Sequence, residues 1–322
     1  MKQVTNTDFL TNVLALTAEN QIAVMADNVF DNNAGLLLMK QKSRVNFRVS
    51  GYEILVNINL SKNKGSKSYQ GFDTFNITPN KGAVTPYLRL ANYAAPIPID
   101  DESLEINKDK EKIIDVMQFF MQQAEDTLSD DVNTDLYGDG TGNAGKDMTG
   151  LGAMCEKKTI ASQGSYMNVS DSTYWVNQFA ESTQGAIIGT LRDLYLKTTD
   201  GKDAPDVILA STEFIDQYEN ANESTSGVSV TYGDTRLADA GFASLQYKGI
   251  PMVLDKALDA TDTGTKGLAY MLNSKYLGFE LRDMKFTPFV RPADQLAAVS
   301  YLKYRCQLVT NRRNRQGVIQ LT

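Results

Sequence analysis

The longest regular pattern of apolar positions lies in residues 107–151. Apolar side chains recur there at steps of three and four, which places them on one face of an α-helix. The stripe consists of Ile113, Met117, Phe120, Met121, Ala124, Leu128, Val132 and Leu136. A helix of roughly thirty residues would span about 45 Å, well above the usual length. The pattern therefore predicts one very long amphipathic helix that needs an equally long partner surface.

Strict alternation of apolar and polar residues marks a second kind of element in residues 52–60. Tyr52, Ile54, Val56, Ile58 and Leu60 share one face, as in a half-buried strand. A second extended stretch alternates through Tyr87, Arg89, Ala91 and Tyr93. The segment 61–71 between them is polar and rich in lysine. The two stretches predict a long projecting hairpin. Because two strands bury too little surface to be stable alone, it must pack on its own domain or over another subunit.

Residues after about 175 show mixed α/β patterning. A helical stripe is expected at Ile187, Ile188, Leu191, Leu194 and Tyr195. The apolar run 206–210 predicts a strand buried on both faces, and Ser211 is placed to cap the following helix. Further strands are expected within 247–255, 267–272, 276–281 and 297–310. Residues 1–48 are polar, with one modest helical stripe from Phe9 to Met25, and predict an N-terminal arm.

A glycine run follows the long helix and resembles a nucleotide-binding loop. Residues 140–145 satisfy G-x-G-x-x-G, and all but the last position of a P-loop is present. A phosphate loop needs a strand before it and a helix after it, whereas here the helix comes first. Asp147 also replaces the Ser or Thr that would bind magnesium. An EF-hand fails at Ala144 and Gly150. The run therefore predicts a helix stop, in which glycine permits a left-handed backbone.

Composition removes several classes of function. The chain has 322 residues, of which 42% are hydrophobic, enough for two domains or one elaborated domain. It contains no histidine, which excludes Ser-His-Asp and Cys-His catalysis and His-ligated metals. Cys155 and Cys306 have neither zinc-site nor disulfide-framework spacing and are expected to be ordinary buried thiols. No apolar run is long enough to span a bilayer, so neither a membrane segment nor a signal peptide is expected. No cofactor or metal is predicted.

The net charge of −7 argues against a protein that grips nucleic acid by neutralising phosphates. Residues 98–150 carry fourteen acidic and four basic side chains, whereas residues 295–322 carry five basic and none acidic. Both are expected to be solvated faces. Two pairs of aspartates lie four apart on the long helix, Asp126 with Asp130 and Asp131 with Asp135. A general acid also needs a desolvating pocket, and nothing in the sequence indicates one.

Five short motifs follow one another along the chain. They are Tyr69-Gln-Gly-Phe-Asp-Thr-Phe75 with Thr78-Pro79, Leu136-Tyr-Gly-Asp-Gly-Thr-Gly-Asn143 leading to Gly150-Leu151, Asp206-Val-Ile-Leu-Ala-Ser211, Ala240-Gly-Phe-Ala-Ser-Leu-Gln-Tyr-Lys-Gly-Ile-Pro251, and Thr310-Asn-Arg-Arg-Asn-Arg-Gln-Gly317. In these motifs and in the order of its parts, nearly the whole chain resembles the major capsid proteins of tailed bacteriophages, which share the Hong Kong 97 fold.

The resemblance implies an α+β fold with five parts. They are an N-terminal arm (1–48), an extended β-hairpin loop (49–100), a peripheral domain with a spine helix (101–175), an α/β axial domain (176–285) and a return strand of the peripheral domain (286–322). Expected intersubunit loop residues are Lys62, Lys64, Lys67, Tyr69 and Phe72. The spine-helix exit turn is expected at Gly138, Asp139, Gly140 and Gly142.

The implied function is that of a structural protein, not an enzyme. Copies would assemble through pentamers and hexamers into an icosahedral phage head in the host cytoplasm and enclose double-stranded DNA without reading its sequence. A separate scaffolding protein, a portal protein and a decoration protein are the other expected partners. The acidic helix is hypothesised to face the DNA and repel it. An encapsulin-type compartment with a protein cargo is the main alternative. A carboxylate-based hydrolase is the second, since it needs no histidine.

Overall fold

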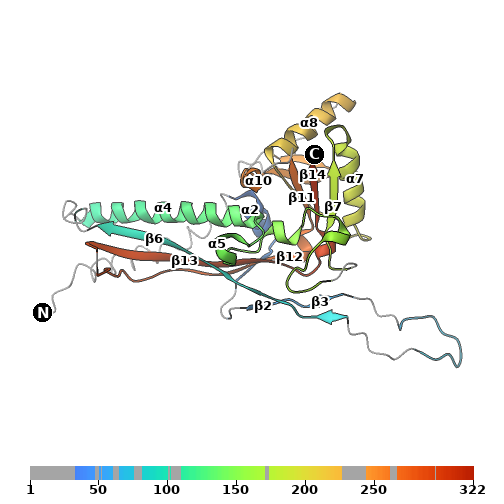
Figure 1. Ribbon diagram of the computed structural model, residues 1–322, viewed down its shortest axis with the longest axis horizontal. Helices are drawn as coiled ribbons and strands as arrows, with labels where there is room; N and C mark the ends of the chain where they lie inside the picture. The colour runs from blue at the N-terminus through green and yellow to red at the C-terminus, as the bar shows by residue number, and fades with distance from the viewer. Residues whose placement is uncertain are drawn as a thin grey trace.

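The computed structural model describes residues 33–47, 51, 53–60, 65–75, 82–100, 102, 110–170, 174–226, 244–261, 267–293 and 295–322. The predicted stripe from Phe9 to Met25 and residues Tyr52, Lys62 and Lys64 lie outside these ranges. The described chain has a long body, a second sheet with helices at one end of that body, and a hairpin that projects beyond it (Figure 1).

The body consists of one long helix on a four-stranded sheet. The helix is α4 (Lys110–Tyr137), and the strand order is β1 (Val45–Phe47), β12 (Leu277–Phe286), β13 (Ala297–Thr310) and β6 (Ala91–Asp100). The predicted long helix is confirmed. Its stripe is buried at Met117, Met121, Ala124, Leu128, Val132 and Leu136, and Phe120 is half-buried. Strands β6 and β13 supply the long partner surface that this stripe required (Figure 1).

The long sheet ends at β6, where the sequence protects the edge. Pro96 and Pro98 lie in this strand opposite Tyr301 and Val299 of β13. Proline has no backbone N–H, so it interrupts the row of donors that an edge strand offers to another strand. The strand expected within 297–310 is confirmed as β13. Burial alternates along its first half, with Ala298, Ser300, Leu302 and Tyr304 buried.

The second sheet has six strands in the order β7 (Gln178–Ser182), β14 (Gly317–Leu321), β11 (Leu268–Leu272), β8 (Val207–Ala210), β10 (Ile250–Leu254) and β9 (Ser244–Tyr247). All four residues of β8 are buried, as predicted for a central strand. One face packs on α7 (Ile187–Thr198) and α8 (Thr212–Ser226) (Figure 1). Ser211 caps α8, since its Oγ accepts the Phe214 N–H at 3.4 Å.

One strand prediction was wrong in detail. The segment 247–255 was predicted as one strand, but β9 ends at Tyr247 and β10 begins at Ile250. Between them, Lys248 and Gly249 both have positive φ, 50° and 78°. Two residues in that conformation form the tight turn that matches the twist of a hairpin. The Lys-Gly dipeptide was therefore a turn signal within an apolar stretch.

The opposite face of the six-stranded sheet is covered by α10 (Ala257–Thr261), the end of α4 and a short helix that sequence analysis missed. This helix is α2 (Ala34–Gln41), in which six of the eight residues are buried. A Cβ on Gly35 would lie 3.0 Å from the Leu136 Cδ2 atom and 3.4 Å from Leu209 Cδ1. Residues 33–47, which fall in the range predicted as an arm, are thus built into the core and the long sheet.

The hairpin consists of two short ladders, β2 (Glu53–Leu55) with β5 (Tyr87–Arg89) and β3 (Ile58–Asn59) with β4 (Ala83–Val84). The first strand has the predicted face, with Ile54 and Ile58 buried. The second strand also alternates, as predicted. Tyr87 and Arg89 are exposed, whereas Leu88 and Leu90 pack towards Ile54 and Val309.

Sheet membership cuts across the predicted ranges 176–285 and 286–322. Strand β12 precedes residue 287 but pairs with β13 in the long sheet. Strand β14 follows β13 but pairs with β11 and β7 in the six-stranded sheet. The chain therefore crosses between the two sheets twice near its C-terminal side, once between β11 and β12 and once between β13 and β14. These two crossings join the sheets covalently.

Candidate intersubunit surfaces and the joint that supports them

The root of the hairpin is fixed to the body by a small apolar cluster. Ile54 and Leu90 pack with Val309 of β13, and Ile58 belongs to the main core. The outer side has no such cover. Leu55 and Tyr87 lie opposite each other in the ladder and are 63% and 43% exposed. The hairpin is thus anchored by one face and presents apolar side chains on the other.

The described part of the loop between the strands carries three exposed aromatic side chains. Tyr69 is 68% exposed, Phe75 47% and Phe72 completely. The rings of Tyr69 and Phe75 meet edge to face at 5.4 Å, and the Lys67 ammonium lies 5.7 Å from the Phe75 ring centre. Of the five predicted loop residues, Lys67, Tyr69 and Phe72 therefore lie in one exposed aromatic segment. Lys62 and Lys64 lie outside the described residues.

The predicted exit turn follows α4 directly. Gly138 N–H donates to the Asp135 carbonyl at 3.0 Å, and Gly140 has a φ of 77°, which glycine adopts without strain. The Asp139 carboxylate accepts the N–H and hydroxyl of Thr141 at 2.9 and 2.7 Å. These two hydrogen bonds lower the pKa of Asp139. A short turn, α5 (Gly142–Gly145), comes next, in which Asn143 and Ala144 have positive φ. The Asp147 carboxylate occupies the space where a side chain on Gly142 would begin.

Two later glycines hold the turn against the helix, a role that no pattern in the sequence indicated. A Cβ on Gly150 would lie 2.3 Å from the carbonyl oxygens of Asp135 and Leu136. A Cβ on Gly152, in α6 (Leu151–Met154), would lie 2.7 Å from that of Tyr137. The Gly152 N–H donates to the Gly138 carbonyl at 3.1 Å. Glycine is required because the returning backbone touches the end of α4.

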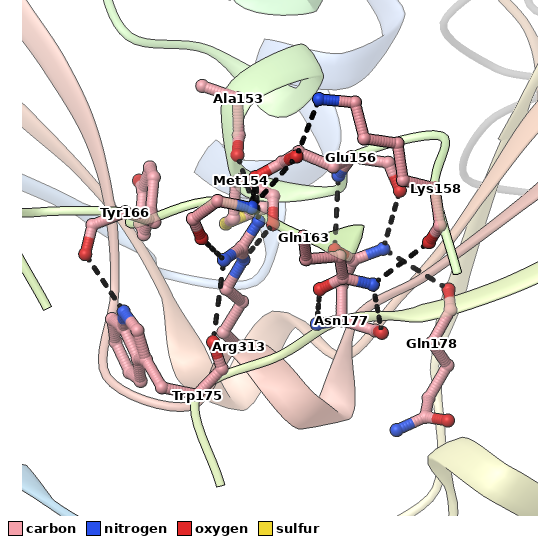
Figure 2. A network of polar contacts seen from close by, with 11 residues as sticks. Ala153, Met154, Glu156, Lys158, Gln163, Tyr166, Trp175, Asn177, Gln178 and Arg313 are labelled. Carbon is pink, nitrogen blue, oxygen red and sulfur yellow. Dashed lines mark hydrogen bonds and ion pairs between the residues drawn. The ribbon is translucent and has the colours of Figure 1, made fainter. Parts of the chain in front are cut away.

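A buried arginine joins this region to the C-terminal strands (Figure 2). Arg313 lies in a 3₁₀ turn, η4 (Arg313–Arg315), between β13 and β14, and is 0% exposed. Its guanidinium donates to four backbone carbonyls, those of Met154 at 2.7 Å, Gly164 at 3.2 Å, Trp175 at 3.4 Å and Ala153 at 3.4 Å. It also pairs with the Glu156 carboxylate at 3.0 Å. Burial alone would raise the pKa of Glu156, but the bond from Arg313 holds that pKa below its usual value.

Asn177 and Gln163 complete the network around Arg313 (Figure 2). The Asn177 side chain accepts the Glu156 N–H at 3.1 Å and donates to the Glu156 carbonyl at 3.0 Å. The Gln163 side chain accepts the Asn177 N–H at 2.9 Å and donates to its carbonyl at the same distance. The irregular segment that contains η1 (Ile160–Ser162) is therefore held by side chains in place of a sheet. These contacts join residues far apart in sequence, which no local pattern indicates.

The acidic side of α4 contains one partly buried carboxylate. Asp126, Asp130 and Asp131 are exposed, whereas Asp135 is half-buried and accepts the Tyr93 hydroxyl at 2.6 Å. The same hydroxyl accepts the Met148 N–H at 3.1 Å. Burial raises the pKa of Asp135, and the charges of Asp147 and Asp131 raise it further. Burial and the charges of Asp130 and Asp147 also raise the pKa of Asp131. Asp135 is therefore partly desolvated, although it lines none of the described pockets.

The groove beside α4 lacks the pair of carboxyl groups that the hydrolase alternative requires. This groove of about 300 Å³ runs between α4 and β6, and Asp131 is the one carboxylate among the residues that line it. A glycosidase needs a carboxylic acid and a carboxylate that face the same cleft. Within the ranges that the structure describes, no three acidic or cysteine side chains form a group suited to a metal ion. Cys155 and Cys306 are both buried free thiols, as predicted, and burial raises the pKa of Cys155 to about 12.

A long helix on a long-stranded sheet, an α/β sheet at its end and a projecting hairpin together form the Hong Kong 97-like capsid fold. No known family profile matches the sequence, and no curated protein matches it significantly. In the part of the chain that the structure describes, none of the helices combines the length and the apolar character needed to cross a membrane.

Solved structures with this fold match most of the chain. A structure of Mycobacterium phage Adephagia has a TM-score of 0.57 at 11% identity and covers 88% of this chain and 90% of its own. The capsid asymmetric unit of cyanophage A-1(L) has a TM-score of 0.57 at 16% identity and covers 86% and 89%. The holo-SrpI encapsulin complex from Synechococcus elongatus PCC 7942 has a TM-score of 0.55 at 11% identity and covers 86% and 84%. At these identities the likeness establishes the fold.

Proposed function

We propose that this protein is the major capsid protein of a tailed phage and builds a closed shell around double-stranded DNA. The observation that carries the proposal is the hairpin, whose Leu55, Tyr87, Tyr69 and Phe72 are exposed on a segment that projects from the body. Exposed apolar side chains on a projecting ribbon cost solubility unless another molecule covers them. Other copies of the same chain are the partners that cover these side chains in the proposed shell.

The assembly requires no strong single contact. Rings of five or six copies need heterologous interfaces, in which one surface of each copy meets a different surface of the next. A hairpin on one side and a body on the other provide two such unlike surfaces. Because each copy is held by several neighbours, the shell gains strength from effective concentration while individual contacts stay weak. Pentamers and hexamers of one sequence then close an icosahedral head.

The predicted division of labour becomes part of this proposal. Residues 49–100 act as the extended loop, the body around α4 as the peripheral domain and the six-stranded sheet as the axial domain that closes the rings. Residues 1–48 act as the arm, with α2 as its fixed end. Lys62, Lys64, Lys67, Tyr69 and Phe72 lie at the intersubunit contact, and the turn at Gly138, Asp139, Gly140 and Gly142 sets the path of the chain. A scaffolding protein, a portal protein and a decoration protein are the proposed partners in the host cytoplasm.

Deletion of residues 62–70 tests the role of the hairpin. The deletion removes no described core residue, so the circular dichroism of the monomer should be unchanged. Particles seen by electron microscopy and sedimentation with the parent chain, with a scaffold supplied if needed, should disappear. Particles at normal yield from the deleted chain would show that the loop is not an intersubunit clamp.

An encapsulin-type compartment is the second candidate, because the SrpI encapsulin complex matches this chain about as well as the phage structures do. The contents of purified particles separate the two functions. Nuclease-protected DNA of uniform length supports the phage head, whereas one stoichiometric protein cargo supports the compartment.

The exposed aspartates of α4 are proposed to face the packaged DNA and repel it, which keeps the genome mobile. Asp126, Asp130 and Asp131 suit the test, whereas Asp135 is engaged by Tyr93 and would confound it. Replacing the three by Asn should leave empty shells intact and make DNA retention more salt-sensitive. Retention that matches the parent across a salt series would reject this role.

A further inference from the structure

The Asn311-Arg312-Arg313-Asn314-Arg315-Gln316 motif places three arginines in three different environments. Arg313 is buried and fully used in the joint. Arg315 is largely buried, pairs with the Asp200 carboxylate and donates to the Thr198 carbonyl at 3.4 Å. Arg312 is exposed and, among the described residues, has no acidic partner. Arg312 is therefore the one arginine of the motif whose charge is not paired with a carboxylate among the described residues.

Arg312 is held in position although it is unpaired. Its guanidinium carbon lies 5.0 Å from the centre of the Tyr276 ring, and the backbone N–H of Arg312 donates to the Thr310 hydroxyl at 3.3 Å. The Tyr276 hydroxyl in turn donates to Asp203 at 2.7 Å. Asp203 is already matched by Lys275 at 2.8 Å, as Asp200 is by Arg315. The nearby carboxylates thus have their own cations, and Arg312 is not neutralised by them.

Arg312 lines a cleft of about 220 Å³ that also contains Arg315, Asn311 and Asn314. Within the described residues, neither asparagine side chain makes a hydrogen bond, and the buried Arg315 Nε has no acceptor. Ile58 and Asn59 of β3 form part of the wall. The root of the hairpin and the C-terminal turn therefore build the cleft together, and whatever binds there also contacts the hairpin.

We propose that this cleft binds a carboxylate of an aspartate or glutamate on a neighbouring copy. An arginine fork and amide donors match the two oxygens of a carboxylate. The chain has 39 acidic residues against 32 basic ones, so copies present carboxylates to one another. The proposal rests on the shell function above and adds the site at which one copy fixes the hairpin of the next.

A nucleic-acid phosphate is the less suitable occupant. Binding to a phosphate backbone relies on several cations in a row, each of which releases counterions. Here two of the three arginines are already committed within the chain, and the exposed Asp200 carboxylate borders the cleft. A single uncompensated charge fits a single carboxylate better than a polyanion.

Crosslinking identifies the occupant directly. Particles are assembled from equal amounts of ¹⁴N- and ¹⁵N-labelled Arg312→Lys chains and treated with a carbodiimide, which joins an amine to a carboxylate in contact with it. Mass spectrometry should find mixed-isotope crosslinks between position 312 and one acidic peptide. Crosslinks confined to one copy, or none in intact particles, would overturn the proposal. Photocrosslinking of position 312 to DNA in filled particles would assign the cleft to nucleic acid instead.

A variant series gives an independent test. Arg312→Gln and Asn314→Asp should each weaken assembly about tenfold, as loss of a charge-assisted hydrogen bond does, while Arg312→Lys retains most of it. Arg192→Gln is the matched control, because Arg192 is exposed and pairs with its sequence neighbour Asp193. Monomer unfolding should be unchanged in all four. If the parent and control form shells and Arg312→Gln forms them equally well, this inference fails alone. If the parent forms no shells, the proposed function fails first.

Discussion

Apolar side chains are buried in the six-stranded sheet and exposed on the outer face of the projecting hairpin. In the sheet, β8 and β11 are buried at every position, with helices on one face and the core of the body on the other. In the hairpin, Leu55, Tyr87 and Phe72 face solvent. The sheet stabilises the monomer, whereas the outer face of the hairpin contributes nothing to it. Changes in the two regions should therefore be separable into effects on folding and effects on assembly.

A matched pair of phenylalanines gives the largest contrast. Phe214 of α8 is 0% exposed, and Phe214→Ala should lower the free energy of unfolding by about 3–5 kcal/mol through lost burial and a cavity. Phe72 is fully exposed, so Phe72→Ala should change it by less than about 0.5 kcal/mol. Urea unfolding of the monomer measures both. Particle yield should fall for Phe72→Ala despite unchanged stability, and a stable variant that assembles normally would remove the distinction.

Arg313→Ala tests whether the hydrogen bonds of Arg313 stabilise the folded monomer, as the buried sheet does. The substitution leaves four backbone carbonyls without their donor and should cost about 3 kcal/mol. The cost falls at the low end for a buried pair, because Glu156 keeps Lys158 at 3.3 Å and the Gly164 N–H at 2.9 Å. Arg312→Ala, on an exposed neighbour, serves as the control and should stay within about 0.5 kcal/mol of the parent in the same urea titration. Equal effects of the two would contradict the assignment of Arg313 to the core.

Two glycines of the exit segment separate steric need from backbone conformation. Gly150→Ala places a methyl group 2.3 Å from two carbonyl oxygens of α4, and should cost about 1–3 kcal/mol as the turn is pushed away. Gly145 has a φ of 76° and open space around it, so Gly145→Ala should cost about 1 kcal/mol from backbone strain alone. Thermal unfolding ranks the two variants, and the reverse order would mean that the turn does not close on the helix.

The smallest predicted effect concerns the acidic side of α4. The pKa values of Asp131 and Asp135 are raised in the folded state, so these carboxylates bind protons more tightly there than in the unfolded chain. Their contribution to stability is full below the ordinary value of 3.8 and is lost as pH rises through the folded pKa. Asp131→Asn should therefore stabilise the monomer at pH 7, by less than about 0.5 kcal/mol because the group is exposed, and the gain should shrink as the pH falls through the folded pKa of Asp131. Asp126→Asn is the control, and an equal pH trend in both would point to net charge alone.

Periodicity in the sequence predicted the elements that bury one long face. The stripe from Met117 to Leu136 required α4, and the run at residues 297–310 coincides with β13. The apolar run that forms α2 was not recognised, since six residues are too few to show a helical period. The alternation predicted from Tyr87 and Arg89 is present in β5, with both side chains on the exposed side.

The supporting contacts were beyond sequence reasoning for a different reason. Tyr93 and Asp135 are 42 residues apart, and Arg313 and Met154 are 159 apart. The local sequence does not distinguish Arg313 from Arg312 or Arg315. Whether each side chain is buried depends on the direction in which it points from η4 or from the residue just before it. Tyr69 and Phe72 were predicted as loop residues from the resemblance to capsid proteins; both are exposed, and their contact with another subunit stays a prediction.

The position of β14 has a consequence for synthesis of the protein. Residues 317–321 lie between β7 and β11, in the interior of their sheet. During synthesis, β7 and β11 are made before β14. The six-stranded sheet can therefore be completed only after residues 317–321 have left the ribosome. A chain that stops before residue 317 therefore lacks an internal strand of the six-stranded sheet.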